Sequence, residues 1–230
     1  MVSTPDGQMP AFLCKPTSTV PHAAVVLLME GFGLTQHIQD VAEQIANVGY
    51  IVIAPDLYYR ELPNNKFGYE EVEQARAMMF CLDFEKSVDE DIRAAIAYVK
   101  SQLNIPNGKV GITGFCLGGG LAFLSACKLS NEIAAIAPFY GVVLDEWIDA
   151  AININVPMYL FFGGVDPFIP LQRVEQMESR LQEFGKEYQL KIYKDADHGF
   201  FCHERSSYNH EAAEDSWHEL VYFFRQHLQS

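Results

Sequence analysis

Apolar residues in this chain gather in short, nearly continuous runs, which alternate with longer stretches where apolar positions recur at helical spacing. The short runs are typical of strands covered on both faces, and the longer stretches have the period of amphipathic helices. Candidate strands span residues 9–14, 23–29, 51–54, 110–113, 134–140, 158–162 and 188–193. This alternation predicts an α/β fold with a mainly parallel sheet of about seven or eight strands, flanked by helices in three layers.

Capping residues and helix breakers set the expected helix boundaries. Thr35 precedes a stretch with apolar positions at helical spacing, and Gly49 ends it. The sequence Ser87-Val88-Asp89-Glu90 predicts a capping box that opens a helix over residues 91–102. Further helices are expected over residues 70–80, 145–150, 171–184 and 211–228. Residues 57–67 contain Pro63-Asn64-Asn65 and follow no period, so we expect a loop over one face of the sheet.

Composition narrows the class of protein further. The 230 residues suit one α/β domain spanning residues 1–230. Sixteen basic residues against 30 acidic residues give a net charge of -14, which argues against nucleic acid as a partner. No apolar run approaches the roughly 20 residues that a membrane-spanning helix needs, so we expect no membrane partner. Five cysteines without paired spacing indicate a reducing compartment, the cytoplasm, and we expect neither a metal nor a cofactor.

The most informative stretch is KVGITGFCLGGG, residues 109–120. An apolar strand runs directly into a pattern of Gly114, Cys116 and Gly118, and an apolar helix follows. This is a cysteine form of the GxSxG turn, in which the two glycines avoid Cβ clashes where a helix leaves a strand end. Cys116 would then project above the sheet as a nucleophile, with the amide of Leu117 near any oxyanion. The alternative is that Cys116 is a small core residue and the glycines only permit close packing.

A cysteine nucleophile needs a base, and the base needs a third group to hold its tautomer. Asp166 and His198 each follow a candidate strand, and the chain order nucleophile, acid, histidine is the one that α/β hydrolases use. Asp166 could instead shape a turn before Pro167. Asp195 and Asp197 are expected to be solvated loop carboxylates. The histidines expected at the surface are His22, His37, His203, His210, His218 and His227.

Motifs along most of the chain resemble those of the dienelactone hydrolases, the cysteine branch of the α/β-hydrolase family. They are MEGFG at 29–33, APDLY at 54–58, GKVGITGFCLGG at 108–119, GGVDPFIP at 163–170 and ADHGF at 196–200. The resemblance implies hydrolysis of a small ester or lactone through a thioester, with a triad of Cys116, His198 and Asp166. It also implies that Glu30 is a carboxylate that helps to ionise the thiol. The amides of Gly31 and Leu117 would form the oxyanion hole.

The sequence departs from the resembling enzymes where they bind a substrate carboxylate. Two arginines hold that group in the dienelactone-cleaving members, and the matching positions here are Val72 and Cys202. Arg76 and Arg205 are close in sequence to these positions, and either is a candidate replacement. A metal site from His198, Cys202 and His203 is not expected, because no paired ligand motif supports it.

Two other functions fit parts of the pattern. Gly31-Phe32-Gly33 after a strand, with Asp56 ending the next strand, could begin a nicotinamide-binding motif, but Gln36 stands where the third glycine belongs. The same fold could also serve as a non-catalytic ligand-binding or thiol-sensing module. Loss of ester hydrolysis in Cys116→Ala would show that the protein is an enzyme and not a non-catalytic module.

Overall fold

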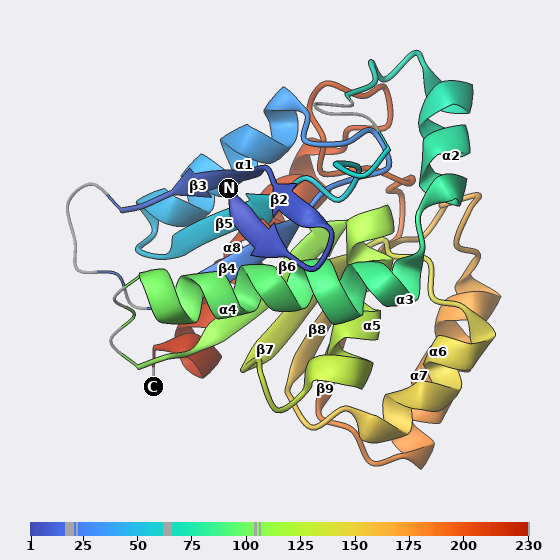
Figure 1. Ribbon diagram of the computed structural model, residues 1–230. Coiled ribbons are helices and arrows are strands. Elements are labelled where there is room, and N and C mark those ends of the chain that lie inside the picture. The colour runs from blue at the N-terminus through green and yellow to red at the C-terminus, as the bar shows by residue number, and fades with distance from the viewer. Residues whose placement is uncertain (17–20, 22, 62–65, 104, 106, 230) are drawn as a thin grey trace.

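The computed structural model describes residues 1–16, 21, 23–61, 66–103, 105 and 107–229. Its main sheet has seven strands in the order β3-β5-β4-β6-β7-β8-β9 (Figure 1). Their bounds are β3 Ala11–Cys14, β4 Ala24–Leu28, β5 Ile51–Pro55, β6 Val110–Phe115, β7 Ala135–Phe139, β8 Met158–Gly163 and β9 Tyr188–Tyr193. Strand β3 runs antiparallel to β5, and every other neighbouring pair is parallel. The predicted mainly parallel sheet is therefore confirmed.

Burial along the strands explains the continuous apolar runs in the sequence. Every residue of β4, β5, β6, β7 and β8 is buried, so these inner strands are covered on both faces. The edge strands β3 and β9 keep partly exposed positions. Before the sheet, β1 (Val2–Thr4) and β2 (Gly7–Met9) form a small antiparallel hairpin.

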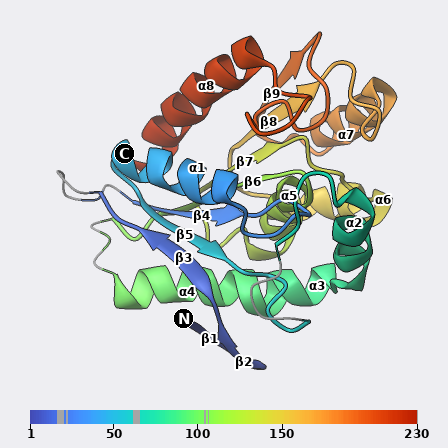
Figure 2. The ribbon, with the colours of Figure 1, turned by 90° about the horizontal axis from the view of Figure 1, so that it is seen from above.

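Helices cover both faces of the sheet. Helices α1 (Gln36–Asn47) and α8 (His210–Leu228) lie on one face, and α4 (Arg93–Gln102) lies on the other (Figure 2). Helix α5 (Leu117–Leu129) packs against β4, β6 and β7. Beside it lie α6 (Asp145–Ala150), the short turn η2 (Ala151–Asn153) and α7 (Leu171–Glu183). These helices complete the three layers predicted from the alternating pattern.

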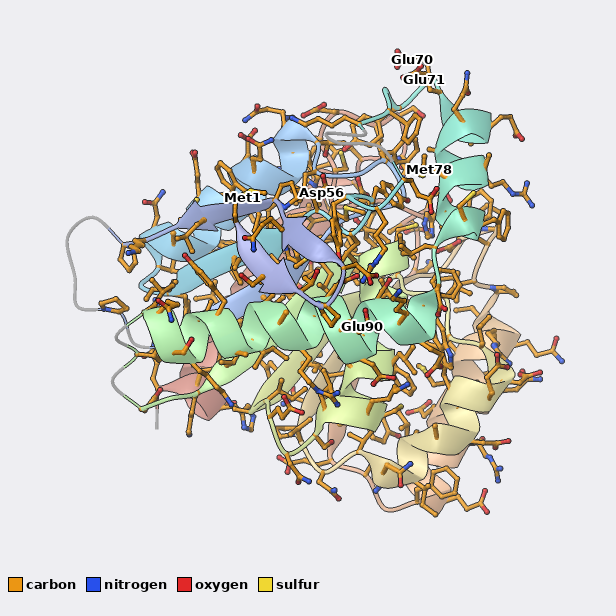
Figure 3. All side chains as sticks on the ribbon, viewed as in Figure 1. Met1, Asp56, Glu70, Glu71, Met78 and Glu90 are labelled. Carbon is orange, nitrogen blue, oxygen red and sulfur yellow. The ribbon has the colours of Figure 1, made fainter. Side chains whose placement is uncertain are left out.

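Helix α2 (Val72–Cys81) stands out from the body of the molecule (Figure 1). Figure 3 shows Glu70 and Glu71 at its outer end and Met78 further along the helix. Met78 and Met79 pack against the core, whereas Val72 is 48% exposed. One face of this helix, which carries Ala75, Met78 and Met79, therefore packs inward, and its outer end is exposed.

The predicted capping box at Ser87 is wrong. The helical segment begins earlier, because the side chain of Asp83 accepts a hydrogen bond from the amide of Lys86 at 3.0 Å. It continues through α3 (Phe84–Lys86) and the wider turn η1 (Ser87–Ile92) into α4. Ser87 lies inside this segment, and its hydroxyl donates to the carbonyl of Asp83 instead of capping a helix.

Some predictions fall on parts of the chain without a described structure. Pro63-Asn64-Asn65 in the expected loop and His22 lie outside the described residues. Elsewhere in that loop, Leu57 and Tyr58 are buried. Within the described part of the chain, none of the helices combines the length and the apolar character that crossing a membrane requires.

Candidate active site

Five chemically distinctive side chains follow the carboxyl ends of five neighbouring strands. Glu30 comes after β4, Cys116 after β6, Tyr140 after β7, Asp166 after β8 and His198 after β9. Because these strands are parallel, their carboxyl ends meet at one edge of the sheet, where sites of α/β proteins collect. The candidate site is built at this edge.

Cys116 occupies a strained turn between β6 and α5. Its φ is 54° and its ψ is -112°, a conformation that a residue with a side chain rarely adopts. A Cβ at Gly114 would collide with the carbonyl of Gly118, and one at Gly118 would collide with the carbonyl of Leu28. The two glycines therefore let the helix start directly beside the strands, which holds the half-buried Cys116 at the apex of the turn.

Asp166 and His198 form a buried pair next to this cysteine. Nδ1 of His198 lies 2.8 Å from Oδ2 of Asp166, and each residue is only 5% exposed. Oδ1 of Asp166 accepts hydrogen bonds from the amides of Phe168 and Ile169 at 2.7 and 3.0 Å. Both carboxylate oxygens are thus used. The side chain of Asp197 accepts from the backbone amide of His198, whereas Asp166 is the carboxylate beside the ring nitrogen.

His198 also interacts with Cys116. Burial alone would lower the pKa of His198, but the charge of Cys116 and hydrogen bonds with Asp166 and Cys116 outweigh burial and raise this pKa to about 10. Because Nδ1 faces Asp166, Nε2 is the ring nitrogen left for the thiol. The structure therefore brings Cys116, His198 and Asp166 together in one chain of contacts.

Glu30 is fully buried and only partly paired. Its Oε2 accepts a hydrogen bond from the hydroxyl of Tyr69 at 3.1 Å, while its Oε1 has no hydrogen-bond partner among the described residues. Nη1 of Arg205 lies 3.7 Å from Oε1. Burial raises the pKa of Glu30, and the charge of Arg205 opposes that rise. Between the two arginines left open by the sequence, Arg205 is the one beside Glu30.

The other candidate arginine is engaged elsewhere. The guanidinium of Arg76 lies over the ring of Phe80, 5.6 Å from its centroid. Cys202, which stands where the resembling enzymes carry an arginine, is fully buried. Arg205 is three residues after Cys202 in the sequence, and its guanidinium lies over the rings of Phe32 and Tyr69 at the site.

Gly31 and Leu117 flank the cysteine on two different turns. The carbonyl of Gly31 accepts a hydrogen bond from the buried hydroxyl of Tyr58 at 2.9 Å, which fixes the turn after β4. A Cβ at Gly31 would lie 3.7 Å from the sulfur of Met79, so α2 packs close to this turn. Leu117 is the first residue of α5, where backbone amides are not used by the helix itself.

Tyr140 is a further residue of this site that was not among the predicted ones. This residue has a φ of 36° and is fully buried, and its ring packs edge-to-face on His198 with centroids 5.1 Å apart. Its hydroxyl has no hydrogen-bond partner among the described residues. Burial, followed by the charge of Glu30, raises its pKa well above the usual range. A signal was available, because Tyr140 directly follows an apolar strand at the same sheet edge as Cys116.

The prediction that His37 is a surface histidine is wrong. It is 2% exposed, because it lies in the first turn of α1 among Phe115, Phe201 and His203. Burial, helped by the neighbouring His203, lowers the pKa of His37 to about 4. His210, His218 and His227 lie on α8, where His210 and His218 are exposed and His227 is partly buried.

One group of possible metal ligands occurs at the surface and does not include the predicted site residues. In the described part of the chain, Asp40, His203 and Glu204 hold ligand atoms within 4.8 Å of one another. His198 and Cys202 are not members of this group. Exposed acidic groups of this kind are common without an ion.

The fold and the strained strand-to-helix turn define an α/β hydrolase. The chain belongs to the dienelactone hydrolase family, whose sequence profile matches residues 9–228. A Synechocystis protein named "Putative carboxymethylenebutenolidase" is 35% identical over 233 residues, covering 96% of this chain and 93% of that protein. A Yersinia pestis protein of the same name is 32% identical and covers 96% of this chain and 84% of its own.

Solved structures agree with this assignment. A crystal structure titled as a putative dienelactone hydrolase from Klebsiella pneumoniae matches with a TM-score of 0.86 at 28% identity, covering 96% of this chain and 95% of that one. An esterase from Thermogutta terrifontis shares the fold with a TM-score of 0.71 at 17% identity, over 96% of this chain and 90% of its own. The chain is accordingly a carboxylic ester hydrolase. This assignment argues against the two alternatives, a nicotinamide-dependent enzyme and a non-catalytic module.

Proposed function

We propose that the protein hydrolyses a small ester or lactone through a thioester on Cys116. The observation that carries this proposal is the continuous contact from Asp166 through His198 to a strained cysteine at the start of a helix. A strained backbone at a partly exposed nucleophile fits a residue held for reaction.

In the first half-reaction, the sulfur of Cys116 attacks the ester carbonyl carbon, and the carbonyl electron pair moves to oxygen. The amides of Gly31 and Leu117 stabilise the resulting oxyanion. When the oxyanion collapses, the bond from carbon to the leaving oxygen breaks, and protonated His198 gives its Nε2 proton to that oxygen. The alcohol leaves, and a thioester on Cys116 and neutral His198 remain.

In the second half-reaction, neutral His198 takes a proton from water while the water oxygen attacks the thioester carbonyl. The same two amides stabilise the second oxyanion. Its collapse breaks the bond to sulfur and releases the carboxylic acid and the Cys116 thiolate beside protonated His198. Asp166 keeps the ring oriented through both steps because it holds Nδ1.

Glu30 supplies a second acid–base group behind the cysteine. Its raised pKa makes the carboxylate a better proton acceptor than an exposed glutamate, and its Oε1 accepts no hydrogen bond from the described residues, although Nη1 of Arg205 lies 3.7 Å away. Arg205 sets how much negative charge Glu30 carries, since its charge favours the ionised carboxyl. This arrangement supports a role for Glu30 in ionising the thiol.

Trapping of the acyl intermediate tests the proposal. A reaction with 4-nitrophenyl acetate, quenched with acid during the steady state, should yield protein heavier by one acetyl group, located at Cys116 by peptide mapping. Cys116→Ala should lose both the adduct and turnover. Cys14→Ala, which removes a thiol from the far edge strand β3, is the matched control and should retain both. Full turnover by Cys116→Ala would exclude the thioester mechanism.

A further inference from the structure

A large apolar ring lies exposed beside the candidate base. The ring of Phe168 packs edge-to-face on His198 with centroids 5.1 Å apart. His198 is 5% exposed, yet Phe168 is 66% exposed. The phenyl ring therefore covers part of the imidazole, and most of its own surface remains open to solvent.

The position of this ring is fixed by the same carboxylate that orients the base. Oδ1 of Asp166 accepts from the amide of Phe168 at 2.7 Å, while Oδ2 contacts Nδ1 of His198 at 2.8 Å. The next residue, Ile169, is 3% exposed and anchors the loop in the core. Phe168 is thus held in register with His198, which distinguishes it from an exposed phenylalanine on a loose surface loop.

A second exposed apolar side chain lies on the adjoining segment. Gly141 and Ile169 line the same small cavity, so the segments that follow β7 and β8 pack against each other here. Val142 follows Gly141 and is 45% exposed. The cation that lines this cavity, Arg173, is already engaged, because it donates to the carbonyl of Val143 at 3.1 Å and pairs with Asp145. This side of the site offers apolar surface without a free positive charge from these residues.

The orientation of the substrate in the proposed reaction indicates which part of it lies near this apolar surface. The carbonyl oxygen of the substrate faces the amides of Gly31 and Leu117, and the leaving oxygen faces Nε2 of His198, which must protonate it. The group attached to the leaving oxygen then passes next to the ring that covers His198. That group is the alcohol portion of the ester.

We propose that Phe168 forms an apolar subsite for the alcohol portion of the substrate, so that the protein prefers esters of apolar alkyl or aryl alcohols. This inference rests on the proposed function and adds the class of leaving group. Burial of an alkyl chain against the phenyl ring removes apolar area from water, and the gain grows with chain length. A carboxylate at the end of the same chain would lose that gain without finding a cation here.

A series of acetate esters tests the subsite. Methyl, butyl and hexyl acetate have alcohols of similar basicity, and 6-acetoxyhexanoate adds a terminal carboxylate to a chain of similar length. All four leave the same acetyl group on Cys116, so differences in kcat/KM report substrate binding and the steps up to departure of the alcohol, and exclude hydrolysis of the thioester. We expect kcat/KM to rise about tenfold from methyl to hexyl acetate and to fall again for the carboxylate.

Variants of the loop locate the effect. Phe168→Ala should lower kcat/KM for hexyl acetate about tenfold more than kcat/KM for methyl acetate, mainly through KM. Phe168→Leu should retain most of the preference. Val165→Ala, which removes another exposed apolar side chain of the same loop, should leave the whole series unchanged.

The outcomes separate the two proposals. An equal loss for every ester in Phe168→Ala would mean that the ring only shields the pair of His198 and Asp166, and it would overturn the subsite. A wild-type series without dependence on chain length, or a preference for the carboxylate, would overturn it as well. In these cases, Cys116-dependent turnover of methyl acetate would leave the thioester mechanism intact. Loss of the thioester mechanism would appear instead as turnover by Cys116→Ala.

Discussion

The two sides of Cys116 are paired very differently. On the side of His198, both oxygens of Asp166 are used, and the ring nitrogen next to it has its partner. On the side of Glu30, three buried atoms lack a hydrogen-bond partner among the described residues: Oε1 of Glu30, the hydroxyl of Tyr140 and Nη1 of Arg205. A buried polar group without a hydrogen-bond partner costs about 1–3 kcal/mol. The ion pair between Nη1 of Arg205 and Oε1 of Glu30, 3.7 Å apart, offsets part of this cost.

The difference suggests that the two sides of Cys116 have different functions in the reaction. The side of His198 needs a fixed orientation, because the base must keep one tautomer and one direction throughout the reaction. The side of Glu30 needs a charge that can change, because a carboxyl group that exchanges a proton cannot satisfy every neighbour in both states. Substitutions on the fixed side should therefore cost far more activity than those on the unpaired side.

The largest effect is expected at Asp166. Asp166→Asn keeps the size of the side chain but favours the wrong tautomer of His198, and kcat should fall by about 10³- to 10⁴-fold. Steady-state hydrolysis of 4-nitrophenyl acetate measures this loss. Asp197→Asn is the matched control, since Asp197 contacts only the backbone amide of His198, and it should change kcat by less than about threefold. A larger loss in Asp197→Asn would reverse the assignment of the acid.

A smaller effect is expected at Glu30. Glu30→Gln removes the proton acceptor while keeping an oxygen for the hydroxyl of Tyr69, so kcat/KM should fall about 10- to 100-fold. The loss should appear in the acylation step, measured as the burst rate with 4-nitrophenyl acetate. Glu211→Gln changes an exposed carboxyl group in the first turn of α8 and should leave the burst rate unchanged. An unaffected burst in Glu30→Gln would remove Glu30 from the mechanism.

Tyr140→Phe should have the smallest effect on activity. The variant removes the unpaired hydroxyl but keeps the ring against His198, so kcat should change by about three- to tenfold. Because the hydroxyl shares its surroundings with Glu30, the pH profile of kcat/KM should shift as well. Tyr222→Phe, at an exposed position on α8, should shift neither quantity. A pH profile identical to wild type would leave Tyr140 with a purely structural role.

The pairing of His198 should also appear in the stability of the protein. Its folded pKa is raised from 6.5 to about 10, so its contribution to the free energy of unfolding is fully present below pH 6.5 and is lost as pH rises through 10. Cys116→Ala removes the main cause of the raised pKa and should flatten this decline. Urea unfolding between pH 6 and pH 10 compares the two proteins. Parallel curves would show that the charge of Cys116 does not stabilise protonated His198.

Patterns in the sequence were sufficient to predict the layers and the main strands. The inner strands are buried on both faces, so their apolar runs are continuous and easy to recognise. The motifs around Cys116, Asp166 and His198 also located residues that the fold brings together. Whether they carry out the proposed steps, and whether residues 1–230 form one domain, stay predictions.

The features that sequence patterns missed depend on contacts between distant segments. Asp83 caps the segment four residues before the predicted cap, so Ser87 is buried inside the segment and donates to the carbonyl of Asp83. His37 became buried because Phe115 and Phe201 close over the first turn of α1. Arg205 and Tyr140 are far from Glu30 in the sequence and lie near it only in the folded chain. No local spacing in the sequence predicts these contacts.

The protonation state of His198 in the resting enzyme tests most directly whether Cys116, His198 and Asp166 act as one unit. Nitrogen NMR of labelled histidine, with His198 assigned by comparison with His198→Gln, gives its pKa without substrate. We expect a protonated His198 ring until about pH 10 in the wild type, and a clearly lower pKa of His198 in Cys116→Ala. A His198 ring that titrates near 6.5 in both proteins would contradict it.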